Sequence, residues 1–486
     1  MSAIDADPVS SGARLGAPGE TDRLSGTAAV RATTGRQRVL VVGIAGLALC
    51  SLWGIRHAHS FVAEPGAAHP FLLAYLLALA LLAWQLTLSS LEKPYVASSP
   101  AQRDYLDGLD VVVSVPAYNE DPDLLRSCLA SLLDQTRRPQ RIYVVDDGTD
   151  KVDLGEYEVI EKWLRNEAFD AGVDVVWQRQ ANAGKRHAQG ACIAGSPGAD
   201  IVVTVDSDSI LDLHAIEQIL LPFADLAVNS VGGVVLTANN TRNLLTRMTD
   251  LWFVCGQLVD RSALSTMRSV LVNSGSLAAY RAHILRANLD AYLNERFFGR
   301  AVQFGDDSML PLYGLATGRS VQQPTAFSFA AMPETVSHHL RQYLRWMRGS
   351  FIRSFWRFRY LPVTGYAYWR HFAGWVQWAL STAIVVRLFL YRPVAHGDWT
   401  TALAVVGVPL GLEYARALRY LTVRRADESF RSQLLTWSLA PLMSLWAFTT
   451  LRVVRLYAMA TCTRTGWGTR QHGAEVTLAP APDPAS

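Results

Sequence analysis

The chain has 486 residues, half of them hydrophobic, and a formal net charge of +3 at pH 7. This length and composition allow one large domain together with membrane spans, whereas so small a charge does not indicate a protein that binds nucleic acid. The five cysteines show no C-x-x-C spacing, so the sequence indicates neither a disulfide framework nor a cysteine-based zinc site.

The N-terminal part predicts a tail followed by two membrane helices. Residues 1–37 are rich in small and polar residues without hydrophobic periodicity, a composition typical of disorder. The apolar runs 39–55 and 71–91 are each close to the roughly 20 residues that cross a bilayer. The first run starts too far from Met1, and lacks the small-x-small site, to be a cleaved signal peptide. Residues 38–92 are therefore predicted to form two transmembrane helices.

From residue 93 to 330 the pattern changes to that of a soluble α/β domain. Between two short β-branched runs, apolar residues recur at helical spacing from Leu124 to Leu133. Repeated strand–helix–strand units imply a mainly parallel sheet, with functional loops at the carboxyl ends of its strands. The predicted strands are residues 110–116, 141–147, 173–177, 200–206 and 230–238.

The C-terminal part predicts a second membrane region. Amphipathic interface helices are expected at 331–370, and transmembrane helices at 371–460. Arginines before residue 39 and in the loop before the last run favour the cytoplasm for both segments, and hence for the α/β domain. The apolar runs are residues 372–391, 400–412 and 432–460.

The number of membrane crossings raises a problem, because it determines on which side of the membrane the segment after the last apolar run lies. Three single crossings would leave the segment "TGWGTR" (465–470) outside, away from the α/β domain. Pro441 should break the last run, because proline removes a helical hydrogen bond. We therefore expect a dip or a pair of short helices that returns the chain to the cytoplasmic side.

The first two strands end in polar motifs. In "VPAYNEDP" (115–122), Tyr118 could stack on a nucleobase and Glu120 could hydrogen-bond it, although tyrosines at strand ends usually just pack. In "VVDDGT" (144–149), Asp146 and Asp147 precede a turn glycine, which an ordinary Asp-Gly turn also explains. Neither motif decides a function by itself.

The next two motifs are more informative. In "NAGKRHAQG" (182–190), Lys185 is one of four lysines in the chain, and it stands beside Arg186 at the start of an expected helix. Two cations and free backbone N–H groups there would suit a diphosphate, although a solvated basic turn has the same pattern. In "VDSDS" (205–209), Asp206 and Asp208 follow a buried strand. Mg²⁺ commonly takes one or two carboxylates together with phosphate oxygens.

Two further motifs would supply a base and an acceptor platform. In "FGDDSML" (304–310), Asp306 and Asp307 offer a carboxylate that could take the proton of an attacking hydroxyl. In "RQYLRWMRGSF" (341–351), helical spacing places three side chains on neighbouring positions of one face, where arginine can offset diphosphate charge and indole can hold a sugar ring. An amphipathic interface helix explains the same residues, and both roles are compatible. The three residues are Gln342, Arg345 and Trp346.

In this order, the motifs resemble the processive family 2 glycosyltransferases, in the branch of hyaluronan, chitin and nodulation chitooligosaccharide synthases. The resemblance extends from residue 39 to 470. It implies an α/β fold: a cytoplasmic, Rossmann-like GT-A domain joined to an α-helical transmembrane region with interface helices.

The resemblance also implies a role for each matching residue. For the uridine it implies contacts from Tyr118, Glu120 and Asp147, supported by Asp146. For the phosphates, and for the Mg²⁺ or Mn²⁺ bound to them, it implies Lys185, Arg186, Asp206 and Asp208. For catalysis it implies Asp307 as general base beside Asp306, with inversion at the anomeric carbon. For the acceptor end and the mouth of a transmembrane channel it implies Gln342, Arg345 and Trp346.

Two more segments match this family. "NSGSLAAYR" (273–281) resembles the stretch that lines the acceptor site, although Ser276 replaces the usual proline and leaves the shape of the loop open. "TGWGTR" resembles a gating loop over the donor, within residues 461–486, whose remainder is an expected disordered tail. The implied acceptor residues are Ser274, Gly275, Tyr280 and Arg281, and the implied gating residues are Trp467, Thr469 and Arg470.

The sequence therefore predicts a processive, inverting glycosyltransferase in the plasma membrane that polymerises UDP-sugars and extrudes the polysaccharide. Its expected partners are the UDP-sugars, the growing chain and the lipid bilayer, and no nucleic acid. A hyaluronan synthase that uses UDP-N-acetylglucosamine and UDP-glucuronic acid is the first choice. A chitin-type synthase that uses UDP-N-acetylglucosamine alone, a non-processive transferase to a lipid carrier and a decayed, non-catalytic scaffold stay open, as does the oligomeric state.

Overall fold

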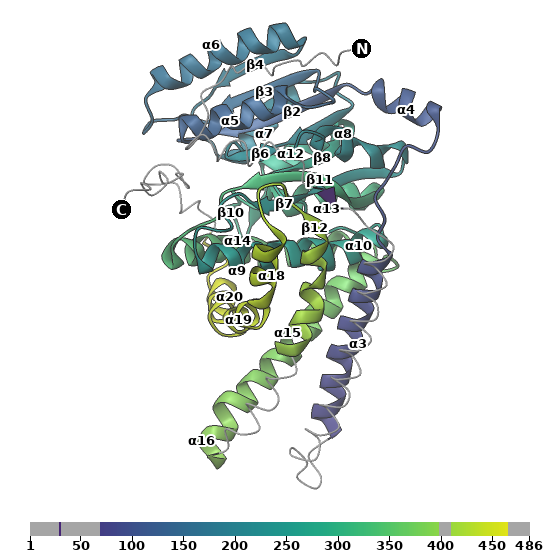
Figure 1. The fold of residues 1–486 in the computed structure, drawn as a ribbon, viewed down its shortest axis with the longest axis vertical. Helices are drawn as coiled ribbons and strands as arrows, with labels where there is room; N and C mark the ends of the chain where they lie inside the picture. Colours follow the sequence, from purple (N-terminus) through teal and green to yellow (C-terminus); the bar gives the residue numbers. More distant parts are fainter. Residues whose placement is uncertain (1–28, 31–68, 398–409, 465–486) are drawn as a thin grey trace, which may run out of the picture.

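The computed structural model describes residues 29–30, 69–397 and 410–464. Four predicted features lie wholly or mostly outside these residues: the N-terminal tail, the first apolar run, the apolar run 400–412 and the "TGWGTR" segment. The molecule in Figure 1 consists of an α/β body and a group of helices below it, some of which project away from the body.

The body is built on a mixed sheet with strand order β4-β3-β2-β5-β8-β7-β11-β6. Strand β8 is antiparallel to both of its neighbours and β6 is antiparallel to β11, whereas the other neighbouring strands are parallel. The mainly parallel sheet is therefore confirmed. The strands are β2 (Val111–Ala117), β3 (Arg141–Asp146), β4 (Asp174–Arg179), β5 (Ile201–Thr204), β6 (Ser209–Leu211), β7 (Val228–Thr237), β8 (Ala278–Arg281) and β11 (Arg319–Ala330).

Helices cover both faces of this sheet because its strands are apolar on both sides. Val111 and Val113 of β2 contribute to one hydrophobic core, while Val112, between them, contributes to the other. The apolar positions predicted from Leu124 to Leu133 are all buried, and all except Leu124 belong to the first core. The first face carries α5 (Pro122–Leu133), α6 (Leu154–Ala171) and α8 (Ala215–Leu220), and the second carries α7 (Lys185–Gly195), α11 (Ala282–Ala287), α12 (Leu289–Leu293) and α13 (Asp306–Thr317).

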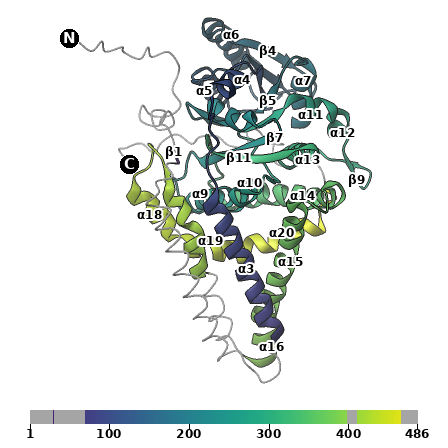
Figure 2. The same cartoon turned by 90° about the vertical axis from the view of Figure 1, so that its right-hand side faces the viewer.

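A layer of helices lies across the lower end of the body (Figures 1 and 2). A third hydrophobic core joins β7 and β11 to this layer and to residues 417–443. The small antiparallel pair of β9 (Arg296–Phe297) and β10 (Arg300–Ala301) lies beside it. The layer contains α9 (Leu244–Cys255), the π-helix η2 (Gly256–Arg261), α10 (Ser262–Thr266) and α14 (Val336–Tyr360).

Two helices extend from this layer in the same general direction, α3 (His69–Leu91) and α15 (Tyr366–Val386), the latter continuing to α16 (Arg392–His396). A hydrogen bond of 3.3 Å from Trp84 Nε1 to the Tyr366 hydroxyl joins the two near the layer. By length and hydropathy, no single helix within the described ranges qualifies as a membrane span. The predicted transmembrane helices at 38–92 and 371–460 therefore stay predictions.

The last apolar run is broken, as Pro441 predicts. It forms α18 (Phe430–Ser438) and then α19 (Ala440–Trp446), which continues to α20 (Arg452–Ala460) with a bend of 44° at the break. The broken pair passes the hydropathy test for a span when both parts are taken together. The break lies at the expected place because Pro441 occupies the first turn of α19.

Both ends of this broken run contact the body. At its start, Arg247 of α9 donates hydrogen bonds to Ser432 and Thr436. At its end, Arg348 of α14 donates to the Thr461 hydroxyl at 3.1 Å. Arg300 of β10 donates to the carbonyl of Thr463 at 3.1 Å. The run therefore stays against the helical layer, and Ala440 and Met443 in its middle are buried in the third hydrophobic core.

Candidate active site

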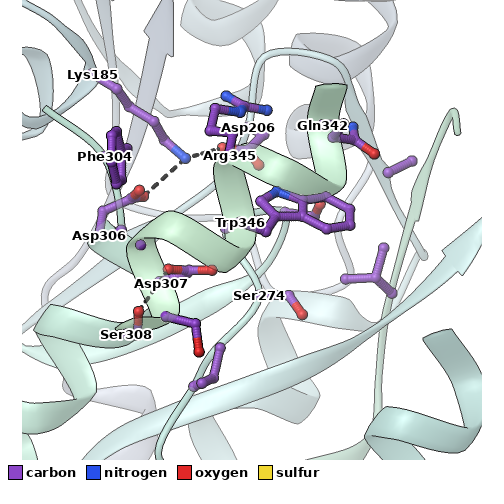
Figure 3. A pocket seen from close by; sticks show the side chains of 18 of the residues that line it. Lys185, Asp206, Ser274, Phe304, Asp306, Asp307, Ser308, Gln342, Arg345 and Trp346 are labelled. Atoms are coloured by element: carbon purple, nitrogen blue, oxygen red, sulfur yellow. Dashed lines mark hydrogen bonds and ion pairs between the residues drawn. The ribbon is translucent and has the colours of Figure 1, made fainter. Parts of the chain in front are cut away.

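A cavity of about 800 Å³ opens between the carboxyl ends of the parallel strands and the helical layer. Its polar end is formed where β2, β3 and β5 terminate, and its opposite end is formed by α9, η2 and α14. Most of the predicted site residues line it together, and several of them are drawn in Figure 3. They are Tyr118, Asp147, Lys185, Asp206, Asp208, Ser274, Gly275, Asp306, Asp307, Gln342, Arg345 and Trp346.

Asp147 organises the polar end of the cavity. Its carboxylate accepts hydrogen bonds from the backbone N–H groups of Ala183 (3.0 Å) and Gly184 (2.7 Å) and from the side chain of Gln180 (2.7 Å). Gly184 is the N-cap of α7, so Asp147 fixes the start of the helix that carries Lys185. The Asp-Gly motif is thus part of the cavity wall as well as a turn.

Lys185 bridges two carboxylates in the cavity (Figure 3). Its Nζ lies 2.5 Å from Asp206 Oδ1 and 2.9 Å from Asp306 Oδ2. Burial by itself lowers the pKa of the ammonium group, but the two carboxylates outweigh burial and raise the pKa above its ordinary value. Gly275 packs so closely here that a Cβ on it would lie 2.8 Å from Asp206 and 2.9 Å from Lys185 Nζ. Lys185 is therefore a buried cation at the acidic centre, which excludes the solvated basic turn.

Asp306 and Asp307 differ in environment although they are adjacent. Gly305, with a φ of +83°, caps α13 and turns the two carboxylates into the cavity. Burial favours the neutral form of both, but Lys185 holds the pKa of Asp306 below its ordinary value. Burial and the charge of Asp306 raise the pKa of Asp307, while a hydrogen bond of 3.0 Å from the Ser308 hydroxyl favours its charged form. A raised pKa in a cavity is the property expected of a general base.

The α14 helix supplies the opposite wall. The Trp346 ring makes an edge contact with Phe253 of α9, with ring centroids 5.5 Å apart. The Gln342 side chain is buried, and its Oε1 accepts no hydrogen bond from any residue that the structure describes. Arg345 faces the same space as Asp206 and Lys185 (Figure 3). This wall therefore offers an aromatic surface, an amide and a cation to a ligand.

Comparisons with known proteins agree with this geometry. The family described as "Glycosyltransferase like family 2" matches residues 109–349. A hyaluronan synthase of Streptococcus pyogenes is 31% identical over 364 residues, which are 74% of this chain and 83% of that protein. The chain belongs to glycosyltransferase family 2. It is an enzyme of that family, and its α/β body has the expected GT-A architecture.

Two more similarities were found. An N-acetylglucosaminyltransferase of Mesorhizobium japonicum is 29% identical to this glycosyltransferase over 389 residues, which are 79% of this chain and 86% of that protein. A mannosyltransferase of Pyrobaculum calidifontis, solved in complex with GDP-Man and Mn²⁺, is 21% identical and has a TM-score of 0.49. That alignment covers 76% of this chain and 99% of the mannosyltransferase chain.

Two residues of the glycosyltransferase expected at the donor site, Glu120 as a contact and Asp146 as a support, lie behind the cavity wall. Glu120 is buried and accepts a hydrogen bond of 2.8 Å from Ser207, between the two metal-binding candidates. Asp146 is buried, accepts from the backbone N–H of Thr149 at 2.9 Å and pairs with Arg179. In this structure Glu120 supports neighbouring cavity residues instead of lining the cavity, and Asp146 lies in a supporting position, as expected.

Arg186 also differs from the expectation. Adjacent helical residues point in directions about 100° apart, so Arg186 faces the protein interior while Lys185 faces the cavity. Its guanidinium donates to Glu295 (2.5 Å) and to the Val302 carbonyl (2.9 Å), and it lies over the Tyr292 ring. In this structure it therefore holds α7 against the β9–β10 segment and leaves the phosphates to other groups.

Tyr280 and Arg281 do not line the cavity. Both belong to β8 in the middle of the sheet, where they are buried. Arg281 donates to the backbone carbonyls of Val228 and Phe223. Of the expected acceptor residues, Ser274 and Gly275 line the cavity, as does the neighbouring Ser276, whereas β8 carries Tyr280 and Arg281 into the sheet.

The gating residues Trp467, Thr469 and Arg470 lie outside the described residues. The described chain ends at residue 464, next to α14, through the hydrogen bonds of Thr461 and Thr463 given above. Arg348, which holds Thr461, is two positions after Trp346 in α14. The described chain therefore ends against α14 and β10, at residues that are not part of the cavity lining.

Sequence reasoning missed several cavity residues of the glycosyltransferase. Trp252 and Phe253 lie at the acceptor wall, and Asp260 pairs with Arg416 at 2.6 Å at its lower edge. Arg261 and Arg357 also line the cavity, and their closest partners are backbone and side-chain oxygens of another segment, so no short motif reveals them. The π-helical turn η2 carries Asp260 and Arg261, and no sequence pattern indicated such a turn.

The D-x-D residues of the glycosyltransferase fit a divalent cation. Asp206 and Asp208 both line the cavity, and no cluster of three or more His, Cys, Asp or Glu side chains in the described part could hold a metal without other ligands. Two carboxylates are what Mg²⁺ or Mn²⁺ takes from a protein when phosphates complete the coordination. The contact of Asp206 with the Lys185 ammonium group shows that this carboxylate already attracts a cation.

Proposed function

We propose that this protein is a membrane-embedded, processive, inverting synthase that transfers sugars from UDP-sugars to the end of a growing polysaccharide, which it extrudes. We further propose that it is a hyaluronan synthase that uses UDP-N-acetylglucosamine and UDP-glucuronic acid. One observation carries the proposal: the D-x-D residue Asp208, the base candidate Asp307 and the acceptor candidate Trp346 line one cavity.

The donor would occupy the polar end of this cavity. Tyr118 and Asp147 lie at the ends of β2 and β3, where a uracil ring and its ribose could be held. Asp206 and Asp208 would hold the Mg²⁺ or Mn²⁺, which supplies positive charge to the diphosphate when bound. Lys185 keeps its proton beside these carboxylates and adds a second positive charge.

The acceptor would occupy the end formed by α14. Its hydroxyl oxygen attacks the anomeric carbon on the face opposite the UDP leaving group, and the bond from that carbon to the diphosphate oxygen breaks, so that configuration inverts. Asp307 accepts the hydroxyl proton as the new bond forms. Arg345 offsets the negative charge of the released UDP, and Trp346 packs against the acceptor sugar.

The plasma membrane would surround the helices that project from the body. Glutamine and arginine side chains at the base of these helices join them to the cavity floor: Gln85 of α3 and Arg416 both contact Asp260 at 2.6 Å. A polysaccharide leaving the acceptor wall would pass between these elements. Trp467 is three residues after Arg464, a reach of about 10 Å along an extended chain. A gating loop would therefore begin where the described chain contacts α14, on the side that we propose to be cytoplasmic.

The similarity to a hyaluronan synthase favours two donors. The similarity to an N-acetylglucosaminyltransferase supports the alternative, a chitin-type synthase that uses UDP-N-acetylglucosamine alone. A non-processive transferase to a lipid carrier gains less support, because one transfer needs no acceptor path toward the projecting helices.

Incubation of the purified protein with each UDP-sugar alone and then in pairs tests the proposal. We expect long polymer only when UDP-glucuronic acid and UDP-N-acetylglucosamine are both present, with Mg²⁺ or Mn²⁺. Polymer from UDP-N-acetylglucosamine alone would establish the chitin-type alternative, and a lipid carrying a single sugar would contradict processivity.

A further inference from the structure

The loop Leu271–Gly275 forms the cavity wall next to Asp307 and is tied down at three points. The Leu271 carbonyl accepts a hydrogen bond of 2.9 Å from Arg357 Nη2. The backbone N–H of Asn273 donates to the backbone carbonyl of Asp307 itself, at 2.8 Å. The Ser274 hydroxyl accepts from Arg261 Nη2 at 2.8 Å. The loop is therefore fastened to the base candidate and to two arginines from different elements.

Arg261 also bonds to the sheet, on the side of its guanidinium away from the loop. Its Nη1 donates to the Gly233 carbonyl of β7 at 2.9 Å, so that one guanidinium bridges the sheet and the loop. The neighbouring Gly232 provides the space, because a Cβ there would lie 2.7 Å from Asn273 Oδ1 and 3.6 Å from Arg261 Nη1. Arg261 belongs to the π-helix η2, and such turns frequently occur at functional sites.

Arg357 approaches from α14, the helix that also carries Arg345 and Trp346. It is buried, lines the cavity and makes no hydrogen bond through Nε to any described residue. Burial lowers the pKa of the guanidinium groups of both Arg357 and Arg261 to about 10, and the charge of Asp307 opposes this effect. Both side chains are therefore cations at neutral pH, on the loop side of Asp307.

We infer that Arg261 and Arg357 are positioning residues that hold the Leu271–Gly275 loop in register with Asp307, so that the acceptor hydroxyl meets the base. This inference rests on the proposed function, because it takes the loop as part of the acceptor wall. At the donor end, Asp147 bonds to the start of α7, and Lys185 pairs with Asp206 and Asp306. Both arginines hold the part of the loop next to Asp307, so loss of a tether should impair use of the acceptor more than it impairs donor binding.

The test measures two rates in one reaction: sugar incorporated into polymer and total UDP released. For R261Q we expect about tenfold less incorporation, because an acceptor displaced by about 1 Å loses much of its reactivity. The donor KM should stay within about twofold of wild type, and a larger share of UDP should come from attack by water. S274A removes the other partner of the same hydrogen bond and should also lower the ratio of sugar incorporation to UDP release. The double variant R261Q/S274A should lower this ratio little further, because both substitutions break one contact.

Conservative variants separate positioning from general disruption. R357K should restore most of the incorporation lost in R357Q, because one N–H donor reaches one carbonyl. R261K should not restore it, because a lysine cannot bridge Gly233 and Ser274 as the planar guanidinium does. R359Q, an exposed arginine of the same helix, is the matched control and should behave as wild type.

The outcomes distinguish this inference from the proposed function. If wild type releases UDP from no UDP-sugar, the proposed function fails. If wild type makes polymer while R261Q, S274A and R357Q keep its ratio of incorporation to UDP release, the inference alone is overturned. A rise in donor KM that accounts for the whole loss would also overturn it. Should R261Q fail to fold, S274A and the comparison of R357Q with R357K still decide the matter.

Discussion

At the scale of single residues, the aspartates of the acidic centre differ in whether a cation lies next to them. Lys185 forms ion pairs with Asp206 and Asp306. The Asp307 carboxylate instead accepts a hydrogen bond from the Ser308 hydroxyl, and cations lie farther from it. The two adjacent aspartates are therefore driven apart in pKa, one lowered and the other raised. This split supports the proposal that Asp307, and not Asp306, exchanges the proton.

The split predicts the pH dependence of activity. Asp307 must be ionised to accept a proton, so kcat/KM should fall as the pH falls through its pKa, with a midpoint above the ordinary aspartate value of about 3.9. D306N removes the neighbouring negative charge, which makes ionisation of Asp307 easier. The midpoint of the residual activity should therefore move to lower pH, as a pH–rate profile would measure. A midpoint that moves to higher pH would contradict the assignment.

The residue motifs were predictable where they follow parallel strands, because the carboxyl ends of such strands share one edge. Lys185, Asp206 and Asp208 reached the cavity for this reason. Arg186 did not, since sequence adjacency says nothing about which face of a helix a residue takes. Arg261 and Arg357 were not predictable, because their partners belong to a loop that approaches only in the folded chain.

At the scale of elements, the sheet was predicted in part. The five predicted strands are β-branched runs and all form. Strand β11 was missed because its sequence, RSVQQPTAFSFA, interrupts the apolar pattern with glutamines and a proline. The antiparallel β8 was missed because its residues read as a binding motif. Its place in the sheet is the reason that Tyr280 and Arg281 are buried.

The segment of residues 418–429, just before α18, is latched to the body, that is, buried charged side chains hold it in place. Arg425 donates to the Thr237 carbonyl at 2.8 Å and pairs with Asp250, which also accepts from Tyr420 at 2.8 Å. R425M leaves Asp250 buried without its cation, so we expect a loss of about 3–5 kcal/mol in unfolding free energy. The midpoint of thermal unfolding in detergent measures it. R431Q, an exposed arginine of α18, should change it by no more than about 0.5 kcal/mol. Equal midpoints for the two variants would refute the latch.

At the scale of the whole molecule, the contacts of the broken last run fix the position of residue 464, the last residue that the structure describes. Its two ends contact α9 and α14, so residue 464 lies at the body. The sequence predicted the break from Pro441 but left the number of crossings open, because hydropathy does not distinguish a crossing from a return.

Sidedness gives a direct check of this arrangement. A cysteine introduced as T469C, in a variant whose five native cysteines are replaced, should react with a membrane-impermeant thiol reagent only after the cells are opened. A cysteine at Thr422, in the latched segment, is the matched control and should behave in the same way. Labelling of T469C in intact cells would place the gating segment outside and end its proposed role.

The central claim is that one cavity brings an activated sugar and a base, Asp307, together. Comparison of UDP release by wild type and D307N, with both donors and Mg²⁺ or Mn²⁺ present, tests it most directly. We predict that D307N releases UDP about 10²- to 10⁴-fold more slowly, while it still binds UDP with an affinity close to that of wild type. Equal rates of UDP release by the two proteins would contradict the account.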